Sequence, residues 1–585
     1  MRHQRTRRGR PLVARLTPFL AALLAAAAPA VAQAPVAAPS AATTATPFAR
    51  FQQEVIEAAF RESPTFGVSQ GRHEFDGRLP DWSEAGLKRT AATFRALRQR
   101  AADWKGLSPK DAFGRDYTVA QLDNYLFWLE EADQPHTNPA YYLNNGLFPD
   151  LYTARTWGTP EARMRGFIAY AEALPKAATQ IRANLRTPMP ETFVYLGKAG
   201  FQGLADFFRG NDGRAAFSAV KDKALWARFD AATKRAGDAM AGLSAWMDEA
   251  KATQTQDFAL GGERLSRMLY ATERVATPVK ELERIGREDL RRNQAALKQA
   301  CAAYAPGASI VDCIAKEEAQ KPDGGVVEAA RAQLAGLRKF IEDKQLVTIP
   351  GPEQALVAEA PSYNRQNFAY IDIPGPFELG QPSTYYIAPP DPSWSKAVQE
   401  GYIPGKANLL FTSAHEVWPG HFLQFLHANR SPDLFGRVFV GYAYAEGYAH
   451  YAEEMMWDAG LGNGDPEVHI GQLSNALLRN CRYLSAIGLH TAGMTVDQSR
   501  KLFMDECYQD EGTARQQAAR GTYDPAYLNY TLGKLMIRRL RDDWTKTHGG
   551  RAGWKAFHDA FLSYGGPPVP LVRSQMMGVR ADAVF

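Results

Sequence analysis

Apolar residues recur every three or four positions through most of the N-terminal half, and this spacing constrains the fold more than any other feature. Such a period places the apolar side chains on one face of a helix. Only two short stretches have the aromatic and β-branched residues typical of strands, FAYIDI at 368–373 and STYYIA at 383–388. The sequence therefore predicts a mostly α-helical, elongated fold with one small β-element.

The β-element lies just before a segment with two histidines, and an edge strand there could line a cleft and pair with an extended peptide. Tyr385 and Tyr386 are the candidates to contact such a peptide. Neighbouring residues on a strand face opposite sides, so only one of the two can do so.

The first 32 residues have the character of a secretory signal, with a basic start, an apolar stretch at 16–31 and small residues at Ala30-Val31-Ala32. We expect cleavage after Ala32, a flexible Ala/Pro-rich tether at 33–47 and a single helical unit at 48–585. The protein is then periplasmic or secreted. A retained membrane anchor is the alternative, although about 20 apolar residues are needed to span a bilayer.

The leader contains six arginines and no acid, so its removal changes the formal net charge from +5 to −1. The mature chain then has no global charge that would favour nucleic acid or an anionic membrane. We expect neither as a partner, and the sequence carries no signal of oligomeric state.

The four cysteines form an even set in a chain that is expected to enter an oxidising compartment. Pairing of near neighbours is the simplest arrangement, Cys301 with Cys313 and Cys481 with Cys507. Two other pairings exist, and free thiols are a further alternative.

The segment FTSAHEVWPGHFLQF, 411–425, carries His415, Glu416 and His421 around a Pro-Gly pair. Zinc sites on one helix place two histidines four positions apart, as in HExxH. Here the spacing is six, which on a regular helix of about 3.6 residues per turn would point the imidazoles about 120° apart. Pro419 and Gly420 can bend the backbone and return His421 to the face of His415. A plain helix stop with two incidental histidines is the alternative.

A second segment, GYAYAEGYAHYAEEM at 441–455, places Glu446 25 residues after His421 on a predicted helix. Burial of an unpaired charge is costly, whereas a metal would balance the charge and accept a ligand bond. Glu446 is therefore a candidate ligand in a metal-site half at about 360–585, and a glutamate that faces water is the alternative.

HEVWPGHFLQ followed by EGYAHYAE resembles the HExxPGHxxQ and EGWALYAE signatures of a large bacterial family, domain of unknown function 885, which is related to the gluzincin metallopeptidases. Segments at 63–83, 477–499 and 523–541 are similar to its other signatures, so the resemblance covers nearly all of the mature chain. It implies a metallopeptidase-like helical fold with a deep cleft.

Position by position, the resemblance implies one zinc ion held by His415, His421 and Glu446. Glu416 is then the general base that takes the proton of the attacking water. The same nitrogen and oxygen ligands accept several divalent ions, so the native metal is open.

The chain departs from the family pattern at Tyr448 and His450, where the family often has Trp and Leu. His450 lies one turn beyond Glu446, where it could orient a ligand, replace one, or only pack. Glu453, two turns beyond Glu446, is in the same way an orienting residue or a surface acid.

A developing oxyanion needs a donor besides the metal. The resemblance offers Tyr530 first and His490 second, and a core aromatic is the alternative for Tyr530. Arg482 and Lys534 are candidates to bind a substrate carboxylate, although a charged residue on a helix is usually only solvated.

These features predict a secreted zinc-dependent hydrolase that cleaves peptide bonds of oligopeptides. The peptide substrate is implied by the resemblance and not by composition. Two alternatives remain: a metal-dependent amidase or esterase on a non-peptide substrate, and a degenerate module that only binds metal.

Overall fold

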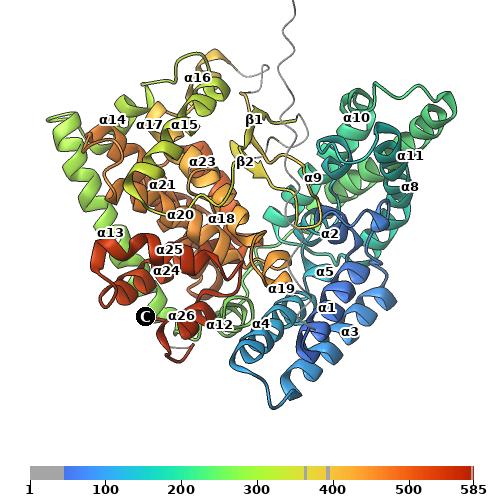
Figure 1. The fold of residues 1–585 in the computed structure, drawn as a ribbon. Helices are drawn as coiled ribbons and strands as arrows, with labels where there is room; N and C mark the ends of the chain where they lie inside the picture. The colour runs from blue at the N-terminus through green and yellow to red at the C-terminus, as the bar shows by residue number, and fades with distance from the viewer. Residues whose placement is uncertain (1–44, 362–364, 366, 391–394, 582–583) are drawn as a thin grey trace, which may run out of the picture. The chain divides into compact units, whose positions relative to one another are not determined.

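The helices that the N-terminal periodicity predicts are present, and they form one of two groups of helices in the fold (Figure 1). The computed structural model describes residues 45–361, 365, 367–390, 395–581 and 584–585. By its contacts the chain divides into Met1–Ala45 and Thr46–Phe585, and the features below belong to the second unit. The predicted signal at 1–32 and most of the predicted tether at 33–47 lie outside the described residues.

The first group contains α1 (Pro47–Glu62), α2 (Pro64–Ser69), η1 (His73–Phe75), α3 (Glu84–Asp103), α4 (Pro109–Leu126), η2 (Phe127–Glu131), α5 (Gln134–Thr137), α6 (Ala140–Asn144), α7 (Asp150–Thr153), α8 (Pro160–Asn184), α9 (Glu191–Arg209), α10 (Asp212–Ala216), α11 (Lys223–Ala250) and η3 (Lys251–Thr253). Its longest helix, α11, packs along both α8 and α9. The buried residues of α11 recur at the predicted spacing, as in Leu225, Phe229, Ala232 and Ala236. The apolar stripe read from the sequence is therefore the face that enters the core.

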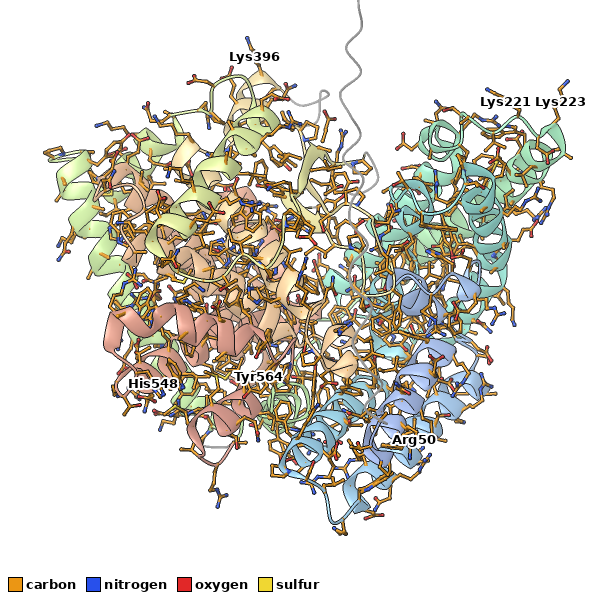
Figure 2. The ribbon with its side chains drawn as sticks, in the orientation of Figure 1. Arg50, Lys221, Lys223, Lys396, His548 and Tyr564 are labelled. Atoms are coloured by element: carbon orange, nitrogen blue, oxygen red, sulfur yellow. A yellow bond between two sulfur atoms is a disulfide. The ribbon has the colours of Figure 1, made fainter. Side chains whose placement is uncertain are left out.

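The second group contains α12 (Gly262–Glu273), α13 (Val279–Tyr304), α14 (Ile310–Glu318), α15 (Val326–Lys344), α16 (Lys396–Tyr402), α17 (Lys406–Glu416), α18 (His421–Ala428), α19 (Leu434–Val438), α20 (Tyr442–Asp458), α21 (Pro466–Thr491), α22 (Val496–Asp505), α23 (Glu511–Tyr523), η4 (Pro525–Leu528), α24 (Asn529–Thr545), η5 (Gly550–Gly553), α25 (Trp554–Leu562) and α26 (Val569–Met577). The mostly α-helical class is confirmed. Charged side chains such as Lys221, Lys223 and Lys396 are exposed and project outward from the helices (Figure 2). No helix of the described ranges combines the length and apolar character needed to cross a membrane.

Each group has its own hydrophobic core, and α19 connects the two. Phe435, Val438 and Phe439 pack into the core of the first group although they follow α18 of the second. The Tyr117 hydroxyl donates to the carbonyl oxygen of Phe439. A cavity of about 280 Å³ lies at this junction, and Phe425, one turn after His421, is part of its wall.

The small β-element is a sheet of three strands, β1 (Leu356–Glu359), β2 (Ala369–Asp372) and β3 (Thr384–Ile387), in the order β1-β3-β2. β1 runs parallel to β3 and β2 runs antiparallel to it. The two predicted strands are confirmed, and β1 was not predicted because Ala and Glu in LVAE have weak strand preference. β2 lies beside α17, which carries His415.

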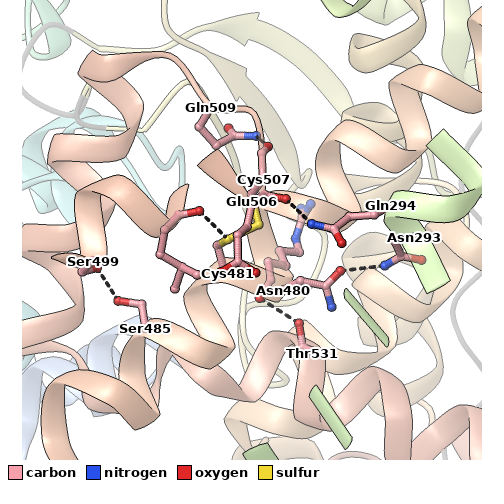
Figure 3. The surroundings of a disulfide bond; sticks show 12 residues. Asn293, Gln294, Asn480, Cys481, Ser485, Ser499, Glu506, Cys507, Gln509 and Thr531 are labelled. Carbon is pink, nitrogen blue, oxygen red and sulfur yellow. Dashed lines mark hydrogen bonds between the residues drawn. A yellow bond between two sulfur atoms is a disulfide. The ribbon is translucent and has the colours of Figure 1, made fainter. Parts of the chain in front are cut away.

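Both predicted disulfides are confirmed, Cys301–Cys313 and Cys481–Cys507. The second bond ties the middle of α21 to the segment between α22 and α23 (Figure 3). Around it, Gln294 of α13 donates to the carbonyl oxygen of Glu506, and Thr531 of α24 donates to that of Arg479. The disulfide is therefore part of a cross-linked region that also holds α13 and α24.

α20 and α24 touch backbone to backbone. A Cβ atom on Gly447 would lie 2.4 Å from the Cα of Gly533, and a Cβ on Gly533 would lie 2.0 Å from the carbonyl oxygen of Ala443. Carbon atoms do not approach so closely, so only glycine permits this contact. It fixes the position of Tyr530 on α24 relative to Glu446 on α20.

Gly533→Ala should therefore destabilise the protein, because the new methyl group forces the two helices apart. Overpacking of this kind costs about 1–3 kcal/mol and occasionally more. Gly336→Ala on α15 is the matched control, because Gly336 is exposed and has nothing within 4 Å of the added atom. Thermal unfolding should show a lower Tm for the first variant and an unchanged or higher Tm for the second. Equal melting of the two variants would contradict the close packing.

Candidate metal centre

The backbone breaks between the two histidines. α17 ends at Glu416 and α18 begins at His421, with a cis peptide bond between Trp418 and Pro419. The chain then folds back on itself, because the amide of Gly420 donates to the carbonyl oxygen of Ala414 over 2.9 Å. A Cβ on Gly420 would lie 1.7 Å from the carbonyl oxygen of His415, so this position accepts only glycine.

The break brings the two imidazoles together, as the sequence predicted. The ring centroids of His415 and His421 lie 4.8 Å apart. Nε2 of each ring lies 3.3 Å from the same atom, Oε2 of Glu446 on α20. The three residues offer ligand atoms that all lie within 4.8 Å of one another, the only such set of histidine, cysteine or acidic side chains found in the described part of the chain.

These three side chains fit a zinc ion. Ligands about 2.0–2.2 Å from a tetrahedral Zn²⁺ lie about 3.3 Å from one another, which agrees with the two separations to Glu446 Oε2. Within the described residues this oxygen is buried without a hydrogen-bond partner. A buried carboxylate oxygen that faces two imidazole nitrogens is the donor set that a divalent cation would satisfy.

Glu453 holds His415 in place from the far side of its ring. Nδ1 of His415 lies 2.7 Å from Oε1 of Glu453, which is fully buried. The ring therefore donates its Nδ1 proton to this carboxylate, and in the neutral ring the Nε2 lone pair then faces Glu446. Carboxylates that fix the tautomer of a ligating histidine in this way are a regular feature of zinc sites.

Buried charges around the centre shift one another's pKa values. Burial alone would raise the pKa of Glu446, but His421 and His415 hold it well below its usual value. Burial and Arg479 would lower the pKa of His415, yet Glu446 and Glu453 raise it to about 9. Without a metal, a proton on His415 would balance Glu446, because Arg479 already balances Glu453. The site therefore favours a further positive charge beside Glu446.

Glu416 lies next to His415 on α17, is 8% exposed and does not belong to the three-residue set. Burial raises its pKa, and His415 and His421 offset this only in part. A carboxylate with a raised pKa binds a proton more readily than an exposed glutamate, which suits a general base.

Tyr530 lies beside the centre. Its ring is stacked with that of His415 at a centroid distance of 6.4 Å, and Glu446 is among the charges that raise the pKa of its hydroxyl after burial. The structure therefore brings the first candidate oxyanion donor next to the predicted ligands.

The expectation that His490 is a second donor is wrong. This residue is 1% exposed, and both ring nitrogens are occupied: Nδ1 accepts from the amide of Leu260, and Nε2 donates to the carbonyl oxygen of Gly521. Burial lowers its pKa to about 4, so the ring is neutral. His490 joins three segments and has no atom free for a substrate.

Lys534 is likewise not a substrate-binding residue. Its ammonium group has no exposed surface and forms ion pairs with Asp289 at 2.6 Å and Glu454 at 3.3 Å. The two carboxylates balance its charge inside the core, where breaking such a pair is strongly destabilising.

The two tyrosines of β3 face opposite sides, as predicted, but Tyr385 does not reach a substrate. Tyr385 has no exposed surface and lies on the side of Ser413 and Glu416. Tyr386 is partly exposed and packs against Tyr370 near Asp372, on the other face of the sheet. Tyr385 therefore packs behind Glu416, and Tyr386 points away from the candidate metal centre.

His450 is fully buried and is not among the three residues that converge. Its Nδ1 lies 3.7 Å from Oε2 of Glu453, and neither ring nitrogen has a hydrogen-bond partner among the described residues. Burial, with Lys534 nearby, lowers its pKa to about 3. His450 thus packs as a neutral ring against the carboxylate that holds His415.

Sequence reasoning missed two arginines. Arg479 lies 3.2 Å from Glu453 Oε1 and balances its charge, and Arg520 of α23 approaches Tyr530. Arg479 stands three positions before Arg482 in the segment 477–499, and residues three apart on one helix share a face, so this spacing was a signal that the two lie together. Nothing in the sequence around Arg520 indicated its position.

A family profile described as "Bacterial protein of unknown function (DUF885)" matches residues 64–576. Two solved structures, both described as a "putative lipoprotein", share the fold. The one from Shewanella oneidensis is 24% identical, with a TM-score of 0.71, over 91% of this chain and 99% of the other. The one from Colwellia psychrerythraea is 15% identical, with a TM-score of 0.77, over 90% of this chain and 98% of the other. No curated protein matches the chain.

Glu453→Gln should weaken metal binding about 10- to 100-fold, because the amide no longer holds His415 by a charged hydrogen bond. Competition with a chelator of known affinity measures the change. Glu263→Gln serves as the control, because the Glu263 side chain is 86% exposed. If Glu453→Gln binds metal as tightly as the unmodified protein, Glu453 does not orient His415.

Glu273 of α12 should make stability depend on pH. Its Oε1 accepts from the amide of Ala443 at the start of α20 and from the side chain of Asn529 at the start of α24. No cation pairs with it in the described structure, and burial raises its pKa from 4.5 to about 8. Between these values the folded chain holds a proton that the unfolded chain releases, so stability falls as the pH rises.

Glu273→Gln keeps the acceptor oxygen and cannot ionise. We therefore expect the stability difference between this variant and the unmodified protein to grow in favour of the variant from pH 5 to pH 8 in urea unfolding. Parallel curves over that range would show that Glu273 does not titrate in this window.

Proposed function

The chain belongs to the DUF885 family of bacterial proteins of unknown function, and on that premise we propose that it is a secreted zinc-dependent hydrolase that cleaves peptide bonds of oligopeptides. The observation that carries this proposal is the approach of two imidazole nitrogens to one buried oxygen of Glu446, each at 3.3 Å. The resemblance to gluzincin metallopeptidases supports the peptide substrate. The basic and apolar leader supports export.

His415, His421 and Glu446 would hold the ion. When bound, zinc supplies a Lewis acid that activates water and polarises a carbonyl group. Three protein ligands are what a catalytic zinc site uses, because the remaining position is left for water or substrate. A purely structural zinc site would use four.

Glu416 takes the proton of the attacking water and delivers it to the leaving nitrogen. Because Glu416 is buried, bulk water does not compete with the attacking water for its carboxylate. Its raised pKa favours transient protonation. Tyr530 donates its hydroxyl to the carbonyl oxygen as negative charge develops there. Glu453 and Arg479 hold His415 during this step.

The metal content of purified variants tests the ligand set independently of catalysis. We expect about one zinc per chain in the purified protein, a strong loss of zinc in His415→Ala and Glu446→Ala, and no loss in His548→Ala, whose exposed ring lies at the outer edge of the C-terminal helices (Figure 2). Elemental analysis measures this directly. Unchanged zinc in His415→Ala or Glu446→Ala would remove that residue from the ligand set.

Glu416→Gln should retain the zinc, and its rate of peptide hydrolysis should fall by about 10²-fold or more. Digestion of a mixed peptide library, with product masses as the readout, tests the activity. Full activity of a zinc-loaded Glu416→Gln variant would contradict the role of Glu416. Turnover of small non-peptide amides or esters alone would replace the peptidase assignment by the amidase or esterase alternative.

A further inference from the structure

Three guanidinium groups lie close to the ring of Tyr530. Their central carbons lie 4.9 Å (Arg482), 5.8 Å (Arg479) and 5.9 Å (Arg520) from the ring centroid. Arg479 and Arg482 come from α21, and Arg520 comes from α23. The cluster therefore lies on the side of Tyr530 that is shared by two helices, next to the metal centre.

Two of these arginines have anionic partners, and the third does not. Arg479 pairs with Glu453 at 3.2 Å, and Arg520 pairs with Asp524 at 3.0 Å. The Nε of Arg482 donates to the neutral Oε1 of Gln517 over 2.8 Å, and no carboxylate of the described residues forms an ion pair with Arg482. The cluster thus carries one positive charge in excess, located on Arg482.

Burying the positive charge of Arg482 without an anionic partner destabilises the folded protein. Burial, together with the neighbouring Arg520, lowers the pKa of Arg482 to about 10. Arg482 is half-buried rather than sealed, so a ligand can reach it. Because Gln517 engages Nε, the two terminal nitrogens of the fork remain for a carboxylate, the group whose geometry the guanidinium matches with two parallel hydrogen bonds.

The distance between Arg482 and the metal centre limits how far the substrate carboxylate can lie from the cleaved bond. The path from the His415 ring to Arg482 runs through Tyr530 in legs of 6.4 and 4.9 Å, so the two groups cannot be farther apart than the two legs together. A peptide residue extends about 3.3–3.6 Å. Part of this span is taken up by the distance from the His415 ring to the bound ion and by the distance from the guanidinium to the carboxylate. The remaining length holds one or two residues between the cleaved bond and the carboxylate.

We propose that Arg482, with Arg520 beside it, binds the free C-terminal carboxylate of the substrate, so that the enzyme removes one or two residues from the C-terminus of a peptide. The inference rests on the proposed hydrolase function and adds the substrate class to it. The bond broken is the C–N bond of the last or second-last peptide unit. Water's oxygen joins the carbonyl carbon, and its protons pass to the new carboxyl and amino groups, where they equilibrate with solvent.

One pair of peptides tests this in the zinc-loaded protein: a hexapeptide with a free C-terminus and the same hexapeptide with a C-terminal amide. We expect the free acid to be shortened by one or two residues from its C-terminus. The amide should be cleaved about 10- to 100-fold less efficiently, because a hydrogen-bonded charge pair is lost. Equal cleavage of both peptides, or products cut in the interior, would overturn the inference and leave the hydrolase proposal intact.

A binding measurement keeps the test independent of turnover. In zinc-loaded Glu416→Gln protein, calorimetric titration should show the free acid binding about 10- to 100-fold more tightly than the amide. If neither peptide is hydrolysed by the unmodified protein, the hydrolase proposal fails, and this titration still decides whether the protein selects a free carboxylate. Equal affinities would overturn the inference.

Arg482→Gln should abolish the preference for the free acid, because it removes the guanidinium that pairs with the carboxylate. Arg515→Gln on α23 removes the same charge from an exposed position, 72% exposed, and should keep the preference. A free-acid preference that survives in folded Arg482→Gln protein would assign the carboxylate to another group. If Arg482→Gln does not fold, the comparison of the two peptides on the unmodified protein decides the question.

Discussion

The break in the backbone between Glu416 and His421 decides where the two imidazoles point, and the proposed metal centre depends on it. On a continuous helix the six-residue spacing would direct the rings to different sides. Here Gly420 packs so closely on the carbonyl oxygen of His415 that no side chain fits, and its amide closes the turn on Ala414. The rings end 4.8 Å apart, with Glu416 held just before the break.

The second requirement is charge balance along α20. This helix buries or nearly buries three carboxylates, and each has partners that can carry positive charge. Glu446 faces two imidazoles, Glu453 pairs with His415 and Arg479, and Glu454 pairs with Lys534, Arg538 and Arg292. Buried charges are tolerated only with such partners. Glu446 differs from the other two because its partners are imidazoles that a metal can share, whereas Glu454 is fully neutralised by protein groups.

The sequence predicted which three side chains converge, because their types and spacing carry chemistry that short motifs can express. Two histidines, a Pro-Gly pair and a glutamate on a following helix, together with the family resemblance, indicated His415, His421 and Glu446, and near-neighbour pairing was the simplest arrangement for the disulfides. The sequence could not predict that Lys534 is buried in an ion pair, because its partner Asp289 lies 245 residues away in the chain. The same holds for His490, whose two partners are backbone groups of Leu260 and Gly521. Arg520 and β1 acquire their positions only from tertiary contacts, which no local pattern encodes.

Anomalous diffraction at the zinc edge from crystals of the zinc-loaded protein tests the centre most directly. A site formed by the broken helix predicts one strong peak, within bonding distance of both Nε2 atoms and of a carboxylate oxygen of Glu446, with α17 ending at Glu416. A peak at any other position, or a continuous helix through 417–420 that turns His421 away from His415, would contradict it.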